Sequence, residues 1–558
     1  MARHHFLHSP YGEVHLEGLS THLRVEATSP LAADWALGWW HARQRPDEAL
    51  FCRSFWRGNV AAKGRASSAR AELDAFVRRW ATDADLAAET AGLTGAHRAR
   101  VEAYVQGFNQ PSRFGSTPWT PEDCHLLVRT LGFLEWWETR APQIEFLLGT
   151  LPSGLDWSQI LDLWPHLGPE PDRSLWTDLD GRLGLSADAR RLIGNLVRFR
   201  RGKDWIVPPS QSLAGRPLLA GSFVTDAPEP FLAVHIETPD GSVRGLSRPG
   251  HPGFLAGKTR WLAWQTTPVV DDIVALRIED GPWGTTLGGR WVGAGRTGTL
   301  QALLTLEEAT SIPLAEKTRG LGSACLDVAA VDFRGEVARW TLGARWKRSR
   351  PGDAWLPDRS PWPDTVEPRV PSLDPEVVGG RLTAAHLEAL LSQTESPLVG
   401  QILPALRFLL PDTVDGNRLR RWTGHPESGP EARQFDRLYE SVVEVFWEAS
   451  PRAPHPRSAA YYALLPAVDR LVASPHSSWF PSREKNGRLA EAVRRAFSPG
   501  RTPGPSLLGR DAARARWTED QDVGRTFATT AAFVADPGVA EWNVWSSDPP
   551  GPNPFETW

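Results

Sequence analysis

Hydrophobic and polar positions follow three successive patterns along the chain. Over 33–109, apolar residues recur every three or four positions, which predicts helices. From 205 to 348, short runs rich in Val, Leu, Ile and Trp alternate with turn sequences such as Pro-Asp-Gly, which predicts strands. Helical periodicity returns over 383–472. The order of helices, strands and helices predicts an α+β fold, in which helices cover a large sheet.

The composition is that of a globular protein with enough apolar material for a large core. The chain has 558 residues, of which 41% are hydrophobic and 23% are charged, and its formal net charge is -4. This balance argues against a nucleic-acid partner held by bulk positive charge. The three cysteines exclude a disulfide scaffold. The 27 tryptophans are unusual, but tryptophan serves both cores and binding surfaces, so their number locates no site.

The first residues contain no continuous apolar stretch of the kind that a signal peptide has. No run of about 18 apolar residues, the length that spans a membrane, occurs in the sequence. We therefore expect a cytoplasmic protein and no membrane among its partners.

Short motifs with a known chemistry are only partly present. Residues 252–259 read PGFLAGKT and resemble a phosphate-binding loop, but Pro252 stands where the loop needs glycine. A turn is predicted there instead. His4, His5 and His8 could bind a metal, but a histidine cluster at a mobile chain terminus is usually incidental. These motifs by themselves leave the function open.

Several longer segments occur in an order that is typical of one enzyme family. They are YGEVHLEG (11–18), ADWALGWWHARQRPDEALFCRSFWRGNVAAKG (33–64), VEAYVQGFN (101–109), WTPEDC (119–124), GKDWIV (202–207), GRPLLA (215–220), RGLSRPGHPGFLAGKTRWLAWQTTPVVDDIVALRIE (244–279) and DFRGEVARWTLGARWKR (332–348). Each segment is a weak signal alone. Together and in this order, they make the chain resemble the penicillin acylase (penicillin amidase) family of N-terminal-nucleophile hydrolases.

This resemblance implies the family's fold, an N-terminal-nucleophile hydrolase-like αββα sandwich with large helical additions. It also implies three parts: a helical region at 1–170 similar to the family's α chain, a spacer-like segment at 171–201, and a β-rich then helical region at 202–558 similar to the β chain. We expect the spacer to stay uncleaved and the parts to form one intertwined structural unit.

The family's enzymes cut themselves before a Ser, Thr or Cys, which then attacks an amide carbonyl with its own α-amine as the base. In this chain the corresponding position, three residues before Trp205, is Gly202. Glycine has no side chain, and no Ser, Thr or Cys occurs over 187–204. The resemblance therefore implies an acylase-like protein without a catalytic nucleophile.

The family's oxyanion donors are also absent. The backbone donor follows a motif threonine, which is Thr267 here, so its position is Pro268, and proline has no N–H group. The second donor, an asparagine, precedes an arginine that matches Arg381, but no asparagine occurs between Asn195 and Arg381. Arg381 is thus a candidate remnant of the family's arginine that supports this asparagine, but here it has no asparagine to support.

The resemblance implies no organic cofactor, and its calcium site is incomplete. The family's pair of aspartates reads Asp272 and Ala275, so one oxygen ligand is missing. Glu279 and backbone carbonyls are the remaining candidates for calcium ligands.

Three functional hypotheses remain open. In the first, the protein is a single-chain, non-catalytic binding or scaffold protein for an unknown protein partner or a small acylated ligand, with Trp205, Trp264 and Thr267 as pocket candidates. In the second, it is an amide hydrolase with an atypical nucleophile such as Ser210, Ser212 or Cys325. In the third, it is a structural subunit that docks through the Pro- and Trp-rich tracts at 355–371 and 545–558.

Overall fold

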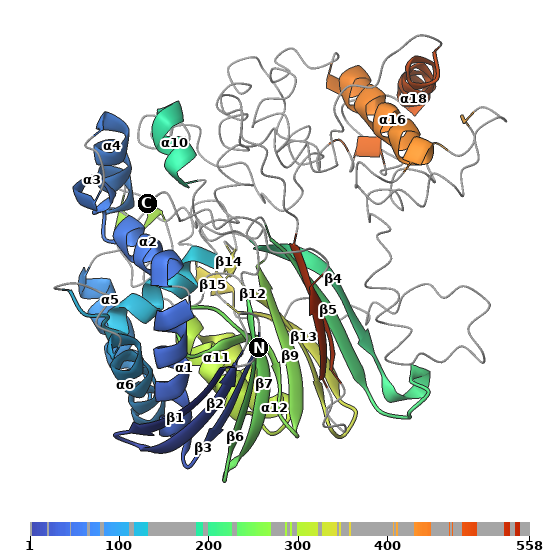
Figure 1. Ribbon diagram of the computed structural model, residues 1–558. Coiled ribbons are helices and arrows are strands. Elements are labelled where there is room, and N and C mark those ends of the chain that lie inside the picture. Colours follow the sequence, from blue (N-terminus) through green and yellow to red (C-terminus); the bar gives the residue numbers. More distant parts are fainter. Residues whose placement is uncertain are drawn as a thin grey trace. The chain divides into compact units, whose positions relative to one another are not determined.

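The computed structural model describes a part of the chain (Figure 1). The described residues are 3–18, 22–44, 46–63, 67–78, 83–110, 117–131, 186–193, 199–225, 231–268, 285–286, 291–292, 298–321, 326–342, 345–347, 356–358, 406, 409–410, 429–447, 468, 471–472, 482–498, 529–535 and 542–546.

Two β-sheets organise the described residues. The larger sheet has nine strands in the order β1 (Arg3–Ser9), β2 (Gly12–Gly18), β3 (His22–Ala27), β6 (Leu232–Thr238), β7 (Gly241–Ser247), β8 (Phe254–Lys258), β9 (Leu262–Pro268), β12 (Leu326–Asp332) and β13 (Val337–Leu342). The smaller sheet has four strands in the order β17 (Trp542–Ser546), β16 (Thr529–Ala535), β5 (Leu218–Thr225) and β4 (Phe199–Val207). Neighbouring strands are antiparallel, except that β3 and β6 are parallel.

Helices, short strands and 3-10 turns make up the remaining described elements. They are α1 (Pro30–Gln44), α2 (Pro46–Trp56), α3 (Val60–Lys63), α4 (Ser68–Val77), α5 (Asp83–Gly92), α6 (Gly95–Asn109), α10 (Ala187–Ile193), η4 (Pro209–Gln211), β10 (Thr285–Thr286), β11 (Trp291–Val292), α11 (Thr299–Glu308), α12 (Ile312–Ala315), η5 (Glu316–Gly320), β14 (Arg345–Lys347), β15 (Leu356–Asp358), α16 (Gly429–Trp447) and α18 (Ser482–Ala496). A further helical stretch covers 121–131.

The layers follow from the burial pattern of the strands. Buried and more exposed residues alternate along β2 and β3, because α1 covers one face of the sheet there. Every residue of β12 is buried, because α12 packs against it and strands β4 and β5 of the smaller sheet lie against it as well. The described residues thus form helix, large-sheet and small-sheet layers, and the predicted α+β fold class is confirmed.

The helical layer is held by a close crossing of α1 and α6. A Cβ on Gly38 would lie 2.1 Å from the carbonyl oxygen of Tyr104, and a Cβ on Gly107 would lie 1.8 Å from the carbonyl oxygen of Trp35. Each helix therefore needs a glycine where the other crosses it. The buried tryptophans of this region, Trp35, Trp39 and Trp40, fill the core beside the crossing.

The chain divides into two compact units. One consists of residues 1–136, 185–391 and 528–558 and contains both sheets; the other consists of 137–184 and 392–527 and contains α16 and α18, which pack together. The division at 170 and 202 that the family resemblance implies stays a prediction. No helix among the described residues is long and apolar enough to cross a membrane.

Two predictions from local motifs were wrong. Residues 254–258 of the PGFLAGKT segment form strand β8 instead of a turn. All five residues are buried, and α11 packs against the strand. The amino-terminal histidines lie in strand β1 and not in a mobile terminus. Since side chains alternate along a strand, His5 points to the helix side, where it contacts Trp39, while His4 and His8 point the other way.

Candidate functional site

The position that the family resemblance assigns to the nucleophile lies inside strand β4. This strand pairs with β5 on both sides of Gly202, from Phe199 opposite Thr225 to Val207 opposite Leu218. The register shifts between Arg201 and Asp204, so Gly202 lies in a β-bulge. The strand is thus paired on both sides of this position, and glycine offers no side-chain atom there.

Strand β9 of the larger sheet faces this region. The two sheets approach so closely that a Cβ on Gly221 of β5 would lie 1.8 Å from the Oε1 atom of Gln265 on β9. Further along β9, Thr267 is buried and pairs with Asp327 of β12, and Pro268 ends the strand opposite Leu326. The end of β9 therefore carries a residue without an N–H donor at position 268.

The charge beside Thr267 is already compensated. Asp327 is almost fully buried, and its Oδ2 atom accepts a hydrogen bond of 2.6 Å from Nε of Arg339. Because the guanidinium neutralises this carboxylate, the end of β9 has no uncompensated charge from Asp327 that could activate a nucleophile.

The two predicted pocket tryptophans differ in how far the structure describes them. Trp264 is fully buried: its ring lies over Gly257 of the neighbouring strand, and its Nε1 donates to the carbonyl oxygen of Phe254 at 3.3 Å. It fills the core on one face of the sheet, over β8 and β9. Trp205 pairs with Ala220 through the backbone, and its side chain is outside the described residues. A pocket lined by these residues stays a prediction.

The other predicted residues divide in the same way. Ser210 is exposed in the turn η4, and Ser212 is buried just after it, with no hydrogen-bond partner for its hydroxyl group among the described residues. Cys325, Arg381 and the calcium candidates Asp272 and Glu279 lie outside the described residues. Within the described part of the chain, no group of three or more His, Cys, Asp or Glu side chains is arranged to hold a metal ion.

Sequence reasoning missed a buried polar network between α1, α6 and β7. The Nδ1 atom of His41 lies 2.8 Å from the hydroxyl of Tyr104, its Nε2 atom lies 3.1 Å from the Oγ of Ser247, and the backbone N–H of Gly250 donates to the Tyr104 hydroxyl. Burial raises the pKa of Tyr104 well above its usual value, so its hydroxyl group keeps its proton.

Each ring nitrogen of His41 thus has a hydroxyl group as its neighbour, that of Tyr104 at Nδ1 and that of Ser247 at Nε2. All three side chains are buried, and the network ties the helices to the loop after β7.

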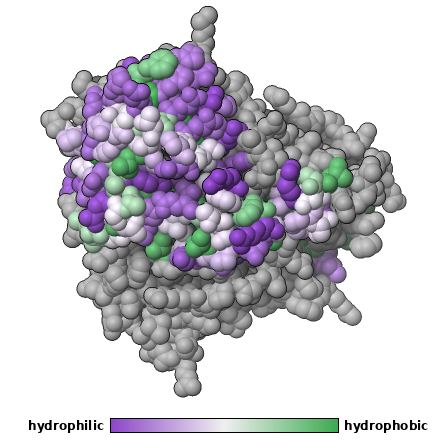
Figure 2. Space-filling model, turned by 90° about the horizontal axis from the view of Figure 1, so that it is seen from below, coloured by the Kyte–Doolittle hydropathy of each residue, from purple (hydrophilic) through white to green (hydrophobic). Residues whose placement is uncertain are grey.

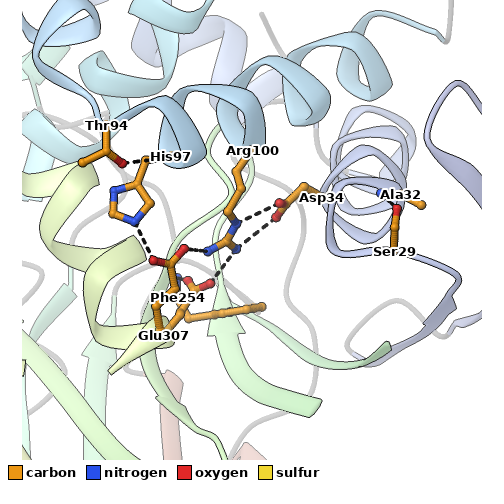
Figure 3. Close-up of polar contacts among 9 residues, drawn as sticks. Ser29, Ala32, Asp34, Thr94, His97, Arg100, Phe254 and Glu307 are labelled. Atoms are coloured by element: carbon orange, nitrogen blue, oxygen red, sulfur yellow. Dashed lines mark hydrogen bonds and ion pairs between the residues drawn. The ribbon is translucent and has the colours of Figure 1, made fainter. Parts of the chain in front are cut away.

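A second missed cluster joins α1, α6 and α11 around one guanidinium (Figure 3). Arg100 donates to both carboxylate oxygens of Asp34, at 2.8 and 3.1 Å, and to Oε2 of Glu307 at 2.7 Å. The other oxygen of Glu307 accepts the backbone N–H of Phe254, the first residue of β8. Burial raises the pKa of Glu307 to about 7, although Arg100 opposes this shift.

The signal that could have revealed both clusters is a polar residue inside an apolar helical repeat. Asp34 and His41 interrupt the run 33–55, and both are buried. Buried polar groups of this kind have partners, but the partners in these clusters come from positions 63 to 207 residues away, which no local pattern indicates.

Comparisons with known proteins agree with the sequence motifs. A family model described as penicillin amidase matches residues 23–296. The acyl-homoserine lactone acylase QuiP of Pseudomonas putida is 25% identical over 280 residues, which are 46% of this chain and 34% of that protein. Its namesake in Pseudomonas aeruginosa is 26% identical over 277 residues, which are 44% of this chain and 32% of that protein. This chain was also matched to a solved structure of a thermostable penicillin G acylase from Alcaligenes faecalis. The match covers 60% of this chain and 88% of that chain, with 14% sequence identity and a TM-score of 0.38.

The family match identifies the class of this part of the protein. Residues 23–296 belong to the penicillin amidase family. The matched segment covers about one third of the length of each curated relative.

Proposed function

We propose that this family member is a non-catalytic, single-chain binding or scaffold protein. The observation that carries the proposal is the place of Gly202, a residue without a side chain in a strand that is paired on both sides of it. Pro268 supports it independently, because the matching position of the family supplies a backbone N–H donor. Loss of one such donor costs an enzyme about 3 kcal/mol of transition-state stabilisation.

The ligand we propose is a small acylated molecule. The two curated relatives are named as acyl-homoserine lactone acylases, so an N-acyl homoserine lactone is the first ligand class to test. A protein that has kept the family's binding region but not its nucleophile would bind such a molecule without hydrolysing it. A cytoplasmic location and a protein partner remain predictions of the sequence.

The third hypothesis, docking through the tracts at 355–371 and 545–558, stays a prediction, because most of these residues lie outside the described part of the chain. On the face shown in Figure 2, hydrophobic residues of the described part are scattered among hydrophilic ones. The described residues include four exposed large hydrophobic side chains: Phe6, Leu213, Leu314 and Phe333.

The second candidate function is that of an amide hydrolase with an atypical nucleophile. Ser212 favours it, because its buried hydroxyl group is unpaired among the described residues in the loop that joins β4 to β5. Against it, burial hides this hydroxyl from a substrate, and the exposed Ser210 has no base among the contacts described for it.

Two measurements test the proposal. The intact mass of the purified chain should correspond to the whole of its 61.7 kDa, and two fragments that meet near residue 202 would contradict it. Incubation with N-acyl homoserine lactones and with a phenylacetyl amide should release no acid, while equilibrium dialysis detects binding of the intact ligand. Release of acid that Ser212→Ala or Ser210→Ala abolishes would establish the hydrolase instead.

A further inference from the structure

Strand β1, at one end of the nine-stranded sheet, has features of an association surface. Among the described residues it pairs with β2 alone, and it is visible as the dark-blue strand at the margin of the sheet in Figure 1. Its central residue, Phe6, is 78% exposed, more than any other large hydrophobic side chain of the described part. A long edge strand with an exposed aromatic residue is a template for another strand.

The backbone groups of β1 that point outward can be identified from the neighbouring strands. The carbonyl oxygen of Glu13 on β2 accepts the N–H of Thr28, so the backbone of Glu13 faces β3. Because these groups alternate along a strand, Val14 and Leu16 face β1 and bond to their partners Leu7 and His5. The N–H and C=O groups at positions 4, 6 and 8 therefore point away from β2.

The side chains at these positions are symmetric about Phe6. His4 and His8 flank it at equal distances along the strand and on the same face. On this face the order His4, Phe6, His8 reads the same in both directions, so a two-fold axis through Phe6 would match this face of the strand to itself. Such an isologous contact is the commonest basis of a dimer.

We propose that β1 pairs in antiparallel fashion with β1 of a second copy of this chain, centred on Phe6. The pairing opposes the two Phe6 residues, and it opposes His4 of each copy to His8 of the other. Each of these pairs exchanges two backbone hydrogen bonds through the outward groups. The two large sheets then continue across the dimer.

The charges next to β1 fit this pairing. On β2, Glu17 lies opposite His4 and Glu13 lies opposite His8, with 3.8 Å between Nδ1 of His8 and Oε1 of Glu13. Each His4–His8 pair of the dimer is therefore flanked by one carboxylate on either side. The Phe6 ring stacks on His15 of β2, with 4.5 Å between ring centroids, so its position on this face of the sheet is defined.

The strand also has few of the devices that protect edges. Residues 3–9 contain no proline and no lysine, and their pairing with β2 continues without a bulge. A seven-residue strand buries less area than a standard interface, so we expect a weak, concentration-dependent dimer.

Sedimentation velocity over a concentration series tests the dimer. The whole chain should show a monomer–dimer equilibrium. Phe6→Lys should lower the dimer affinity at least about tenfold, since it places two positive charges opposite each other at the centre of the pairing. Leu213→Lys, the same kind of change at another exposed site, should leave the equilibrium unchanged. A chain that stays monomeric up to about 1 mM, or a dimer that Phe6→Lys does not weaken, would overturn the proposal.

Cysteine crosslinking tests the register. Opposed residues of a hydrogen-bonded pair lie about 5.5 Å apart between Cα atoms, within reach of a disulfide. Phe6→Cys should thus form a disulfide-linked dimer on oxidation. His4→Cys should not, because the two copies of residue 4 are roughly 14 Å apart along the strands. Equal crosslinking of both variants, or none in either, contradicts the pairing centred on Phe6.

Discussion

Replacement of Glu307 by glutamine should change how the stability of the protein depends on pH. Burial raises the pKa of this carboxyl group from 4.5 to about 7 in the folded protein. The folded state therefore binds the proton more tightly than the unfolded state does. The stability that the protonated group contributes is fully present below pH 4.5 and is lost as the pH rises through 7. At 1.36 kcal/mol per pKa unit, the loss amounts to about 3 kcal/mol over the full range.

Glutamine does not titrate and keeps an oxygen for the N–H of Phe254. Relative to the wild type, Glu307→Gln should therefore gain about 2 kcal/mol or more of unfolding free energy between pH 5 and pH 8. Guanidinium unfolding followed by tryptophan fluorescence, with both proteins at both pH values, measures this difference. The control Glu308→Gln should show no gain of unfolding free energy between pH 5 and pH 8 relative to the wild type, or a loss. Burial raises the pKa of Glu308, but His97 and Arg100 outweigh burial and lower it.

The reasoning about Glu307 is refuted if the two proteins differ by the same free energy at pH 5 and pH 8. It is also refuted if the variant loses stability relative to the wild type as the pH rises. The second result would mean that the attraction of Arg100 exceeds the cost of burying the Glu307 carboxylate.

Three further substitutions test the packing and the site. Gly38→Ala should destabilise the protein by about 1–3 kcal/mol in denaturant unfolding, because the new Cβ meets the carbonyl oxygen of Tyr104 at 2.1 Å. Gly92→Ala is its matched control: a Cβ there meets nothing within 4 Å, so no loss of stability is expected. Gly202→Ser should leave the chain uncut and inactive on amides, because Pro268 still lacks an N–H group; fragments in the mass spectrum would contradict this.

Much of the fold could be predicted from the sequence, because periodicity reports which face of an element is buried. The run 33–55 indicated helices, and the structure contains α1 and α2 there. The strand β8 escaped prediction because its five residues are all buried, so it shows no alternation, and a glycine-containing stretch was interpreted as a turn. Gly257 is needed in that strand because the ring of Trp264 lies over it.

The candidate site was predicted only at the level of residue types. The family motifs placed Gly202 and Pro268 at the nucleophile and donor positions, and the structure adds that they lie on β4 and β9, strands of the two facing sheets. The role of Trp264 could not be predicted, since an indole serves a core and a pocket equally well.

The sequence by itself determined the fold class, the family and the absence of a side chain at Gly202, because each depends on residue identity and spacing along the chain. The tertiary structure alone decided which distant polar groups meet. Arg100 gathers Asp34 and Glu307 from two other helices, and His41 lies between the hydroxyl groups of Tyr104 and Ser247. A buried polar group must find a partner, but only the packing of the helices on the sheet decides which partner it finds.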